Sequence, residues 1–475
     1  MLKRFFVLLG VTAGLMCGKV VKVTDFGAVG NGSTDNTKAF ATAFGAACAS
    51  PGSNTVSIPS GIFVVNPHVS PITVCSGMTI TGTGTIQVAS GAGDDNTIFA
   101  PSTPSTNVSN FTLEDITIDQ NADANSTSTI GSAAGHAQSI LQIFAGSNIT
   151  VRNIKASVSG VNSIDINGVS VSGVVVTANH FVFHKQPAQP AFDNSTIYID
   201  GTNFTVSDNL FSSTLSESAV TAIEVHSGTG SISGNVISFY QNGMNVVDTK
   251  HSQITGNIIT SGQFGILLWA LSSGMDGTTV TGNSINLNNV DRGVPTSGGI
   301  ALAYDDSARG AHSSLSITSN LVVCQPEPRP RPVSGDVNYG IGLQALGSLT
   351  NAVVANNIVM NAPVRGVKVG VVVPSLASNI QVVNNTIVNP GSNADPSAAW
   401  YDAAIALDGN LTDVTVTGNR LLFTTNPTHA VGGTYSIYAS DSGATFTQVK
   451  VYDNTVIAFA GSPVLDISPS VITSN

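Results

Sequence analysis

One short pattern recurs along this chain: a few residues of alternating β character, an asparagine, and then two or three apolar residues. Residues 232–237 read Ile-Ser-Gly-Asn-Val-Ile, and residues 254–259 read Ile-Thr-Gly-Asn-Ile-Ile. The shortest step between aligned asparagines is 22 residues, from Asn235 to Asn257, and the longest is 37, from Asn283 to Asn320. The aligned positions are Asn153, Asn179, Asn209, Asn235, Asn257, Asn283, Asn320, Asn357, Asn385, Asn419 and Asn454.

A repeat of this length with two-residue alternation inside it predicts a stacked β solenoid. The 22-residue step is one bare coil, and longer steps are the same coil with an inserted loop. Asparagine tolerates the left-handed backbone of a tight turn, and its amide can hydrogen-bond the next asparagine in the stack. We therefore predict an all-β, single-stranded parallel β-helix, which should wind right-handed, with structural rather than catalytic asparagines.

The N-terminal region differs from the repeat. Residues 1–18 combine a basic start, Lys3-Arg4, with a short apolar stretch and are predicted to be a secretory signal peptide. Cys17 leaves open a lipid-anchored form, although the residues before it match a lipoprotein signal poorly. Residues 34–49 read as a helix capped at Thr34 or Asp35, placed to cover the open end of the solenoid.

Three cysteines lie outside the signal. An exported chain can keep disulfides, and Cys48 and Cys75 are the candidate pair, which leaves Cys324 over. The sequence leaves open whether the pair is bridged.

The segment 23–35, Val-Thr-Asp-Phe-Gly-Ala-Val-Gly-Asn-Gly-Ser-Thr-Asp, together with the helix and Ile58-Pro59-Ser60-Gly61, resembles the opening of the pectate-lyase-like superfamily. The resemblance covers residues 22–85 and implies one β-helix domain over residues 19–475 that acts on carbohydrate. Cys48 and Cys75 resemble the cysteine pair in this region of plant-type polygalacturonases. The catalytic motifs of polygalacturonases are not found in order, so their catalysis is not carried over to this chain.

The composition and charge of the chain limit the classes of molecule that it can bind. Only 9% of residues are charged, compared with roughly 25% in an ordinary soluble domain. The net charge of −11 argues against nucleic acid and against anionic membranes, so no membrane contact is expected beyond the export signal. The expected location is outside the cell, with a periplasmic or lipid-anchored form left open.

Alignment of the stretch before each new coil gives candidate site residues. The first and third residues of each stretch are apolar and should point inward, so the second and fourth should point to solvent. The second-position column is Gln142, Asp165, Tyr198, Glu224, Asn245 and Leu267, and the fourth-position column is Phe144, Asn167, Asp200, His226, Val247 and Trp269.

Carboxylates and aromatic rings that share one face suit sugar, because rings stack on sugar faces and polar groups bind hydroxyls. Asp200 and Glu224 should lie one coil apart with Cα atoms about 8 Å from each other, which suits the acid and the base or nucleophile of glycoside cleavage. With His226 they form the predicted catalytic group. The predicted substrate-binding residues are Asp165, Tyr198, Asn245, Trp269, Asp248, Tyr240 and His184.

Long insertions at 184–194, 288–298 and 325–338 are predicted to wall a groove beside this sheet. The alternative reading of the exposed acids is that they only keep the sheet soluble.

Three functions follow. The first is hydrolysis or transfer at glycosidic bonds of an extracellular polysaccharide, with no cofactor and no metal. The second is a polysaccharide lyase or uronate epimerase, for which Asp165, Asp200, Glu224 and Asp248 could hold Ca²⁺. This reaction needs a cation or arginine to neutralise the uronate. Lys368 is several coils away, and Lys185 and Arg292 lie only in loops. The third is a non-catalytic carbohydrate-binding surface module. The protein could be a monomer or a homotrimer.

Overall fold

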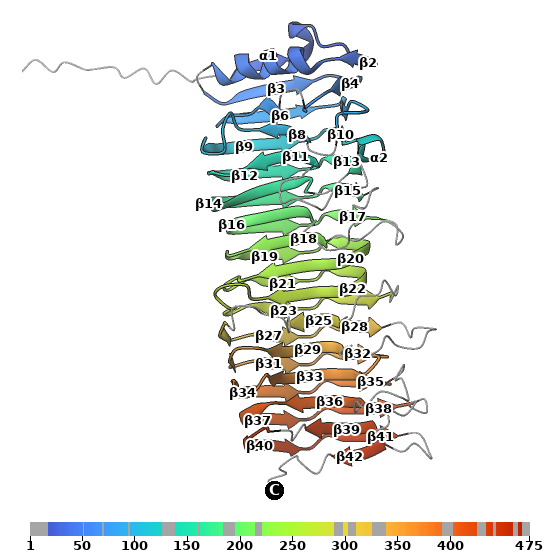
Figure 1. Cartoon of the computed structure of the whole chain (residues 1–475). Coiled ribbons are helices and arrows are strands. Elements are labelled where there is room, and N and C mark those ends of the chain that lie inside the picture. Colours follow the sequence, from blue (N-terminus) through green and yellow to red (C-terminus); the bar gives the residue numbers. More distant parts are fainter. Residues whose placement is uncertain are drawn as a thin grey trace, which may run out of the picture.

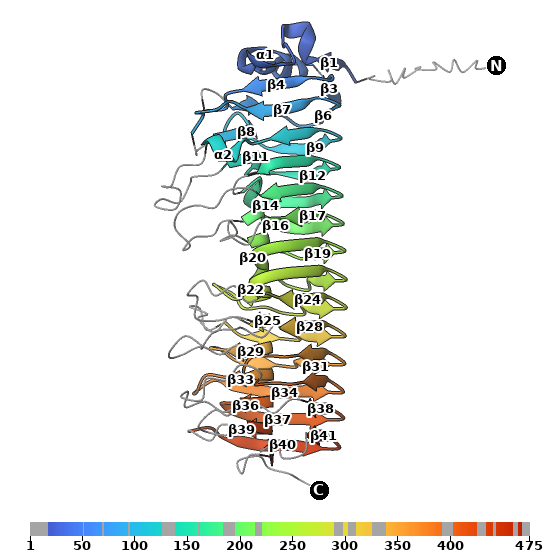
Figure 2. The same cartoon turned by 90° about the vertical axis from the view of Figure 1, so that its right-hand side faces the viewer.

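The computed structural model describes residues 18–50, 52–68, 71–93, 96–125, 138–159, 162–183, 195–213, 221–288, 298–302, 310–324, 339–391, 402–424, 434–439, 443–458 and 464–467. Within these ranges the chain forms one continuous stack of strands, from α1 (Thr37–Cys48) at one end to the red C-terminal strands at the other (Figures 1 and 2). The predicted parallel β-helix is confirmed: strands pair in parallel with their counterparts one coil away.

Each coil contributes to three sheets. In one coil, β18 (Thr221–His226) lies in the first sheet, β19 (Gly230–Ser233) in the second, and the start of β20 (Val236–Val247) in the third. β20 then continues into the first sheet of the next coil. The first sheet carries most of the predicted site residues, among them Asp165, Asp200 and Glu224.

The strands of the first sheet are β5 (Ile72–Thr73), β8 (Asn96–Ala100), β11 (Gln138–Ile143), β14 (Ile164–Thr177), β16 (Ser195–Ser207), β18, β20, β22 (Ile258–Trp269), β25 (Gly298–Leu302), β29 (Tyr339–Ala345), β33 (Arg365–Val371), β36 (Asp402–Asp408), β39 (Thr434–Ala439) and β42 (Val464–Ile467).

The second sheet also takes in the later parts of β14 and β16. Its other strands are β1 (Val20–Lys22), β3 (Asn54–Ile58), β6 (Met78–Gly82), β9 (Val108–Glu114), β12 (Gly146–Arg152), β19, β21 (Gln253–Thr255), β23 (Thr279–Thr281), β26 (His312–Ser313), β27 (Ser316–Thr318), β30 (Leu349–Thr350), β31 (Val353–Ala355), β34 (Leu376–Val383), β37 (Asn410–Thr417) and β40 (Phe446–Tyr452).

The third sheet takes in the first parts of β20 and β22. Its other strands are β2 (Asn31–Asp35), β4 (Ile62–Val65), β7 (Thr85–Val88), β10 (Thr117–Asp119), β13 (Lys155–Ser159), β15 (His180–Phe183), β17 (Leu210–Ser212), β24 (Ser284–Leu287), β28 (Leu321–Cys324), β32 (Ile358–Met360), β35 (Thr386–Val388), β38 (Arg420–Phe423) and β41 (Thr455–Ala458).

The asparagines form a hydrogen-bonded ladder at the turn between the second and third sheets. The side-chain Nδ2 and the backbone N–H of each member donate to Oδ1 of the next member, as from Asn235 to Asn257 at 3.0 Å each. The ladder runs through Asn179, Asn209, Asn235, Asn257, Asn283, Asn320, Asn357, Asn385, Asn419 and Asn454. The predicted structural role of these ten residues is therefore confirmed.

Two details of that prediction were wrong. Asn179 Oδ1 accepts from the backbone N–H of Ile154, so the ladder position in that coil is Ile154 and the assignment of Asn153 was one residue early. The left-handed backbone also belongs to the residue before each ladder asparagine. Gly256 and Asn356 have φ of +63° and +57°. Only the preceding position requires glycine, asparagine or another residue that tolerates positive φ.

At the N-terminal end, α1 begins at Thr37, three residues later than the first predicted position, because residues 31–35 form β2. Asp35 Oδ1 accepts a hydrogen bond from the backbone N–H of Thr37 at 2.9 Å. The apolar face of the helix, which includes Phe40 and Phe44, is buried against the first coils. That the helix serves to protect this end from association remains a prediction.

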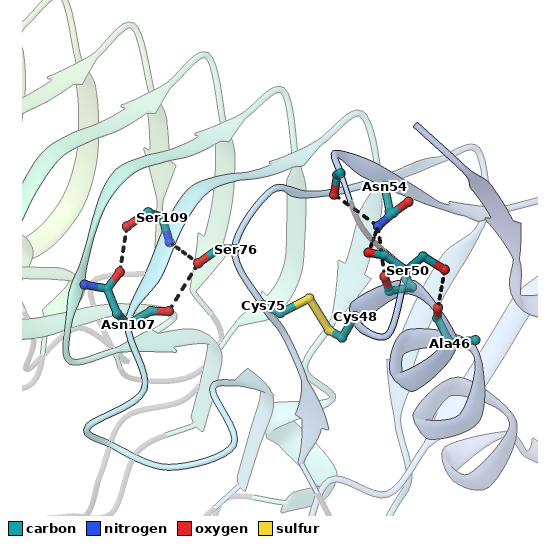
Figure 3. The surroundings of a disulfide bond; sticks show 10 residues. Ala46, Cys48, Ser50, Asn54, Cys75, Ser76, Asn107 and Ser109 are labelled. Atoms are coloured by element: carbon teal, nitrogen blue, oxygen red, sulfur yellow. Dashed lines mark hydrogen bonds between the residues drawn. A yellow bond between two sulfur atoms is a disulfide. The ribbon is translucent and has the colours of Figure 1, made fainter. Parts of the chain in front are cut away.

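Cys48 at the end of α1 forms a disulfide bond with Cys75 (Figure 3), and their Cα atoms are 5.8 Å apart. Cys324 is free and buried. The bond ties the helix to the loop before β6. Asn54 adds a second link, since its Nδ2 donates to the backbone oxygens of Ala47 and Ser50. The predicted signal peptide, apart from Gly18, lies outside the described residues. In the described part of the chain, every helix is too short or too polar to traverse a bilayer.

Candidate active site

The predicted coil registration is confirmed in the first sheet. Asp165 on β14 lies opposite Tyr198 on β16, Tyr198 lies opposite Glu224 on β18, and Glu224 lies opposite Asn245 on β20. In the neighbouring column Asp200 lies opposite His226. The same sheet therefore brings together the predicted catalytic residues Asp200, Glu224 and His226.

Glu224 and His226 are directly hydrogen-bonded. His226 Nε2 lies 2.7 Å from Glu224 Oε1, and the His226 ring packs against Tyr198 with centroids 5.0 Å apart. Glu224 is only 1% exposed, and its other oxygen, Oε2, has no hydrogen-bond partner among the described residues. A buried carboxylate oxygen without a hydrogen-bond partner is energetically costly, so Oε2 has an unmet capacity to accept a hydrogen bond.

Asp200 completes the group from the preceding coil. Burial raises the pKa of its carboxyl, while the nearby His226 and a hydrogen bond from Ser227 act in the opposite direction. One oxygen, Oδ1, is buried without a hydrogen-bond partner in the described part of the chain. Because its side chain is partly exposed and holds its proton to higher pH than usual, Asp200 has the properties of a general acid.

Asp165 lies two coils before Glu224 in the same column. Burial raises the pKa of Asp165 to about 6, and the hydrogen bond that Gln142 Nε2 donates to its Oδ2 at 2.7 Å partly opposes that rise. The carboxyl is thus held in place beside Tyr198 by a neutral partner.

The prediction that the second column faces open solvent was wrong at four positions, one of which is Leu267 at 8% exposed. Asp165 is 5% exposed, Glu224 is 1% exposed and Asn245 is 6% exposed. Asn245 Nδ2 donates to Thr221 Oγ1 at 3.1 Å, which fixes the amide on the outer side of the sheet. Outward residues can thus be buried, because the alternation of a strand sets direction and not exposure.

Tyr240 does not line the groove, contrary to prediction. The strand register shifts on both sides of Tyr240, and Phe239 before it has φ of +66°, so Phe239 is exposed and Tyr240 turns into the core. The Tyr240 hydroxyl bonds Thr196 Oγ1 at 3.1 Å and its ring packs on Phe211.

Asp248 was also misassigned as a substrate-binding residue. Its carboxylate accepts hydrogen bonds from the backbone N–H groups of Leu271, Ser272 and Ser273 and from the Ser272 hydroxyl. These contacts make Asp248 a structural anchor for the turn after β22. His184, Lys185 and Arg292, with most of the predicted groove-wall insertions, lie outside the described residues.

Next along the first sheet comes an outward apolar cluster that contains the predicted residue Trp269. Trp269 packs against Phe264, Leu267, Ala301 and Tyr339. The Tyr339 ring lies directly over Gly342, where an added Cβ would meet the ring at 2.2 Å. Trp269 Nε1 has no hydrogen-bond acceptor among the residues described. Of its aromatic rings only Trp269 is partly exposed, since Phe264 and Tyr339 are buried.

Farther along the sheet lies a polar cluster that the sequence analysis missed, apart from noting Lys368 as remote. Lys368 Nζ lies 3.2 Å from Asp408 Oδ2 and donates to Gln344 Oε1, and Arg365 and Asp402 are buried beside them. A signal for it existed: Lys368 and Asp408 occupy the second and fourth positions of residues 367–370 and 405–408. Among the described residues no group of His, Cys, Asp and Glu is arranged to hold a metal ion.

Two family models match the chain. One, "Rhamnogalacturonase A/epimerase, pectate lyase-like", matches residues 20–245, and the other, "Right handed beta helix region", matches residues 195–421. No curated protein matches the chain significantly.

Solved structures with the same fold include a mutant tailspike protein of the E. coli bacteriophage HK620 in complex with a hexasaccharide. It is 15% identical, with a TM-score of 0.71, over 94% of this chain and 77% of that one. PfbA, a surface adhesin of Streptococcus pneumoniae, is 15% identical, with a TM-score of 0.56, over 90% of this chain and 93% of that one. The parallel coils, these structures and the family models together show the right-handed parallel β-helix fold, and residues 20–245 are similar to the pectate-lyase-like family model.

Proposed function

We propose that this protein is a secreted enzyme that cleaves or transfers glycosidic linkages of an extracellular polysaccharide. The observation that carries the proposal is the convergence of Asp200, Glu224 and His226 on one sheet, with His226 Nε2 2.7 Å from Glu224 Oε1. The fold relative from bacteriophage HK620 holds a hexasaccharide, and one family model is described by a rhamnogalacturonase and an epimerase. Both support carbohydrate as the substrate class.

The three residues have separate roles in this proposal. Asp200, whose pKa is raised by burial, donates its proton to the glycosidic oxygen as the bond to the anomeric carbon breaks. Glu224 acts on the opposite side of the sugar, either by attack on the anomeric carbon or by removal of a proton from water. His226 holds the Glu224 carboxylate in position. The anomeric configuration of the product distinguishes the two roles of Glu224.

The test is a panel of neutral and acidic polysaccharides with product mass analysis, followed by variants on the substrate found. Glu224→Gln and Asp200→Asn are each expected to lower kcat by about 10²- to 10⁴-fold while binding is retained. Glu114→Gln is the matched control, since Glu114 pairs with Arg152 on the second sheet, away from the site. Turnover that persists in both site variants would refute the assignment.

A lyase or uronate epimerase is the second candidate, favoured by the epimerase in the description of the matching family model. Elimination needs a base at the sugar C5 and a cation or arginine that neutralises the uronate. Lys368 and Arg365 are five coils from Glu224 and do not meet this need at Asp200 and Glu224. A product with ultraviolet absorbance, together with sensitivity to calcium chelators, would establish the lyase instead.

A non-catalytic surface module is the third candidate, favoured by the shared fold of the pneumococcal adhesin. Binding of polysaccharide with no turnover of any substrate in the panel would support it. Secretion is tested by the location of the tagged full-length chain, and the choice between monomer and homotrimer by its mass in solution.

A further inference from the structure

The first sheet carries a second polar cluster, which the proposed reaction does not use. We call it the distal cluster. It lies on β29, β33, β36 and β39 and consists of Gln344, Arg365, Lys368, Asp402, Asp408, Tyr435 and Tyr438.

The distal cluster has a buried inner layer. Lys368 is held between Gln344 Oε1 and Asp408 Oδ2, the latter at 3.2 Å. Arg365 is buried next to Asp402, and its Nε has no acceptor within the described ranges. Burial, and to a lesser extent the neighbouring Arg365, lowers the pKa of Lys368 to about 8, although Asp408 acts in the opposite direction.

A buried layer of charged side chains contributes little to the stability of a solenoid. Buried ion pairs seldom stabilise more than apolar side chains of similar volume, and the same positions in the preceding coils hold apolar Phe264, Leu267 and Ala301. In a chain with only 9% charged residues, two buried cations on one strand indicate a function other than packing.

The outer layer is accessible. The Asp408 side chain is 29% exposed, and Lys368 fixes the orientation of its carboxylate. Tyr435 and Tyr438 on the next coil are partly exposed, with ring centroids 5.1 Å apart. An oriented carboxylate beside two tyrosine rings offers the two contacts that a sugar unit uses, hydrogen bonds to its hydroxyls and packing on its ring.

We propose that the distal cluster is a second carbohydrate subsite, which binds an uncharged sugar unit of the same polysaccharide chain that is cleaved at Glu224. This inference rests on the proposed function. The sugar is uncharged because the cluster is already neutral: Arg365 and Lys368 balance Asp402 and Asp408, and the carboxylate that faces solvent would repel an anion.

The spacing defines the length of substrate required. Five coil steps separate Glu224 from Lys368, by way of Asn245, Leu267, Ala301 and Gly342, and five steps of about 4.8 Å give about 24 Å. The aromatic cluster of Trp269 and Tyr339 lies between the two sites. Only an oligosaccharide that spans this distance can occupy both, so the enzyme should favour long chains.

The test uses the full chain with Glu224→Gln, so that bound sugar is not consumed. Uncharged oligosaccharides of graded length, cut from the polysaccharide that the panel identifies, are titrated calorimetrically. Asp408→Asn or Tyr438→Ala, added to this chain, is expected to weaken binding of long oligosaccharides about tenfold and to leave short ones unchanged. Asp413→Asn is the control, because Asp413 is exposed on the second sheet.

The outcomes separate this inference from the proposed function. Short and long oligosaccharides that bind equally, with no effect of either variant on a chain whose unfolding temperature is unchanged, would overturn the distal subsite alone. Tighter binding of an acidic oligosaccharide at the distal cluster would overturn the proposal that this subsite binds an uncharged sugar. Failure of every oligosaccharide to bind, with no turnover by the unmodified chain, would remove both proposals together.

Discussion

Replacement of Asp165 by asparagine is expected to stabilise the protein at neutral pH. Burial raises the pKa of this carboxyl from 3.8 to about 6, so the folded state binds its proton more tightly than the unfolded chain does. The stability that this preference contributes is fully present below about pH 4 and is lost as the pH rises through 6. Asparagine has no charge to bury and can still accept the hydrogen bond that Gln142 donates.

The size of the effect follows from the same values. The rise from 3.8 to about 6 corresponds to about 3 kcal/mol. The unfolding entropy of a chain of this length is about 1 kcal/mol/K, so the thermal midpoint of the variant should exceed that of the unmodified protein by about 3 °C at pH 7.5. At pH 4 the two midpoints should nearly coincide.

The assay is thermal unfolding from pH 4 to pH 8 at one fixed scan rate, because a chain this large can unfold irreversibly. Asp119→Asn is the matched control: Gln87 donates to Asp119 Oδ2 at 2.8 Å, but this carboxylate lies on the third sheet and is partly exposed. Asp119→Asn should change the thermal midpoint less than Asp165→Asn does, because a partly exposed carboxylate is less desolvated in the folded state. A difference for Asp165→Asn that is independent of pH, or of opposite sign, would refute the burial argument.

Two further predictions concern the frame of the fold. Asn257→Ala should lower the stability by about 2–4 kcal/mol, since it leaves the buried Ile232 carbonyl and Asn235 N–H without their hydrogen bonds. Thermal unfolding measures this loss, with the exposed Gln253→Ala as control, and thermal midpoints that are equal in the two variants would contradict the prediction. Tyr240→Phe should cost about 1 kcal/mol through loss of the bond to Thr196 with no change in KM, and a raised KM would show that Tyr240 contacts substrate after all.

The sequence was sufficient for the register of the first sheet because two periodicities agree there. The asparagine repeat aligns the coils, and strict alternation within each stretch assigns faces, which together place Asp165, Tyr198 and Glu224 in one column. Alternation fails where the backbone leaves the β region. The left-handed Phe239 reverses the side on which Tyr240 lies, and nothing in a pattern of apolar and polar residues marks such a bulge.

The solvent exposure of the site residues could also not be predicted from the pattern of apolar and polar residues. Glu224 and Asp165 were expected on a solvent-exposed face because side chains alternate along a strand, yet both are almost inaccessible. Their burial depends on what packs over the sheet, and this is a tertiary property. Asp248 illustrates a related limit. Its carboxylate accepts hydrogen bonds from Leu271 and Ser272 on the next coil, which are 23 and 24 residues later in the sequence. No local motif indicates which carboxylate will bind such a turn.

The asparagine ladder separates the length of a coil from its alignment. Successive members are 22 to 37 residues apart, yet their side-chain bonds all measure 2.9 or 3.0 Å. Inserted residues therefore leave the pitch of the stack unchanged. Such a frame lets whole loops be exchanged or lengthened beside the first sheet without moving its neighbours, so substrate preference could diversify by insertion while the coils beneath stay in register.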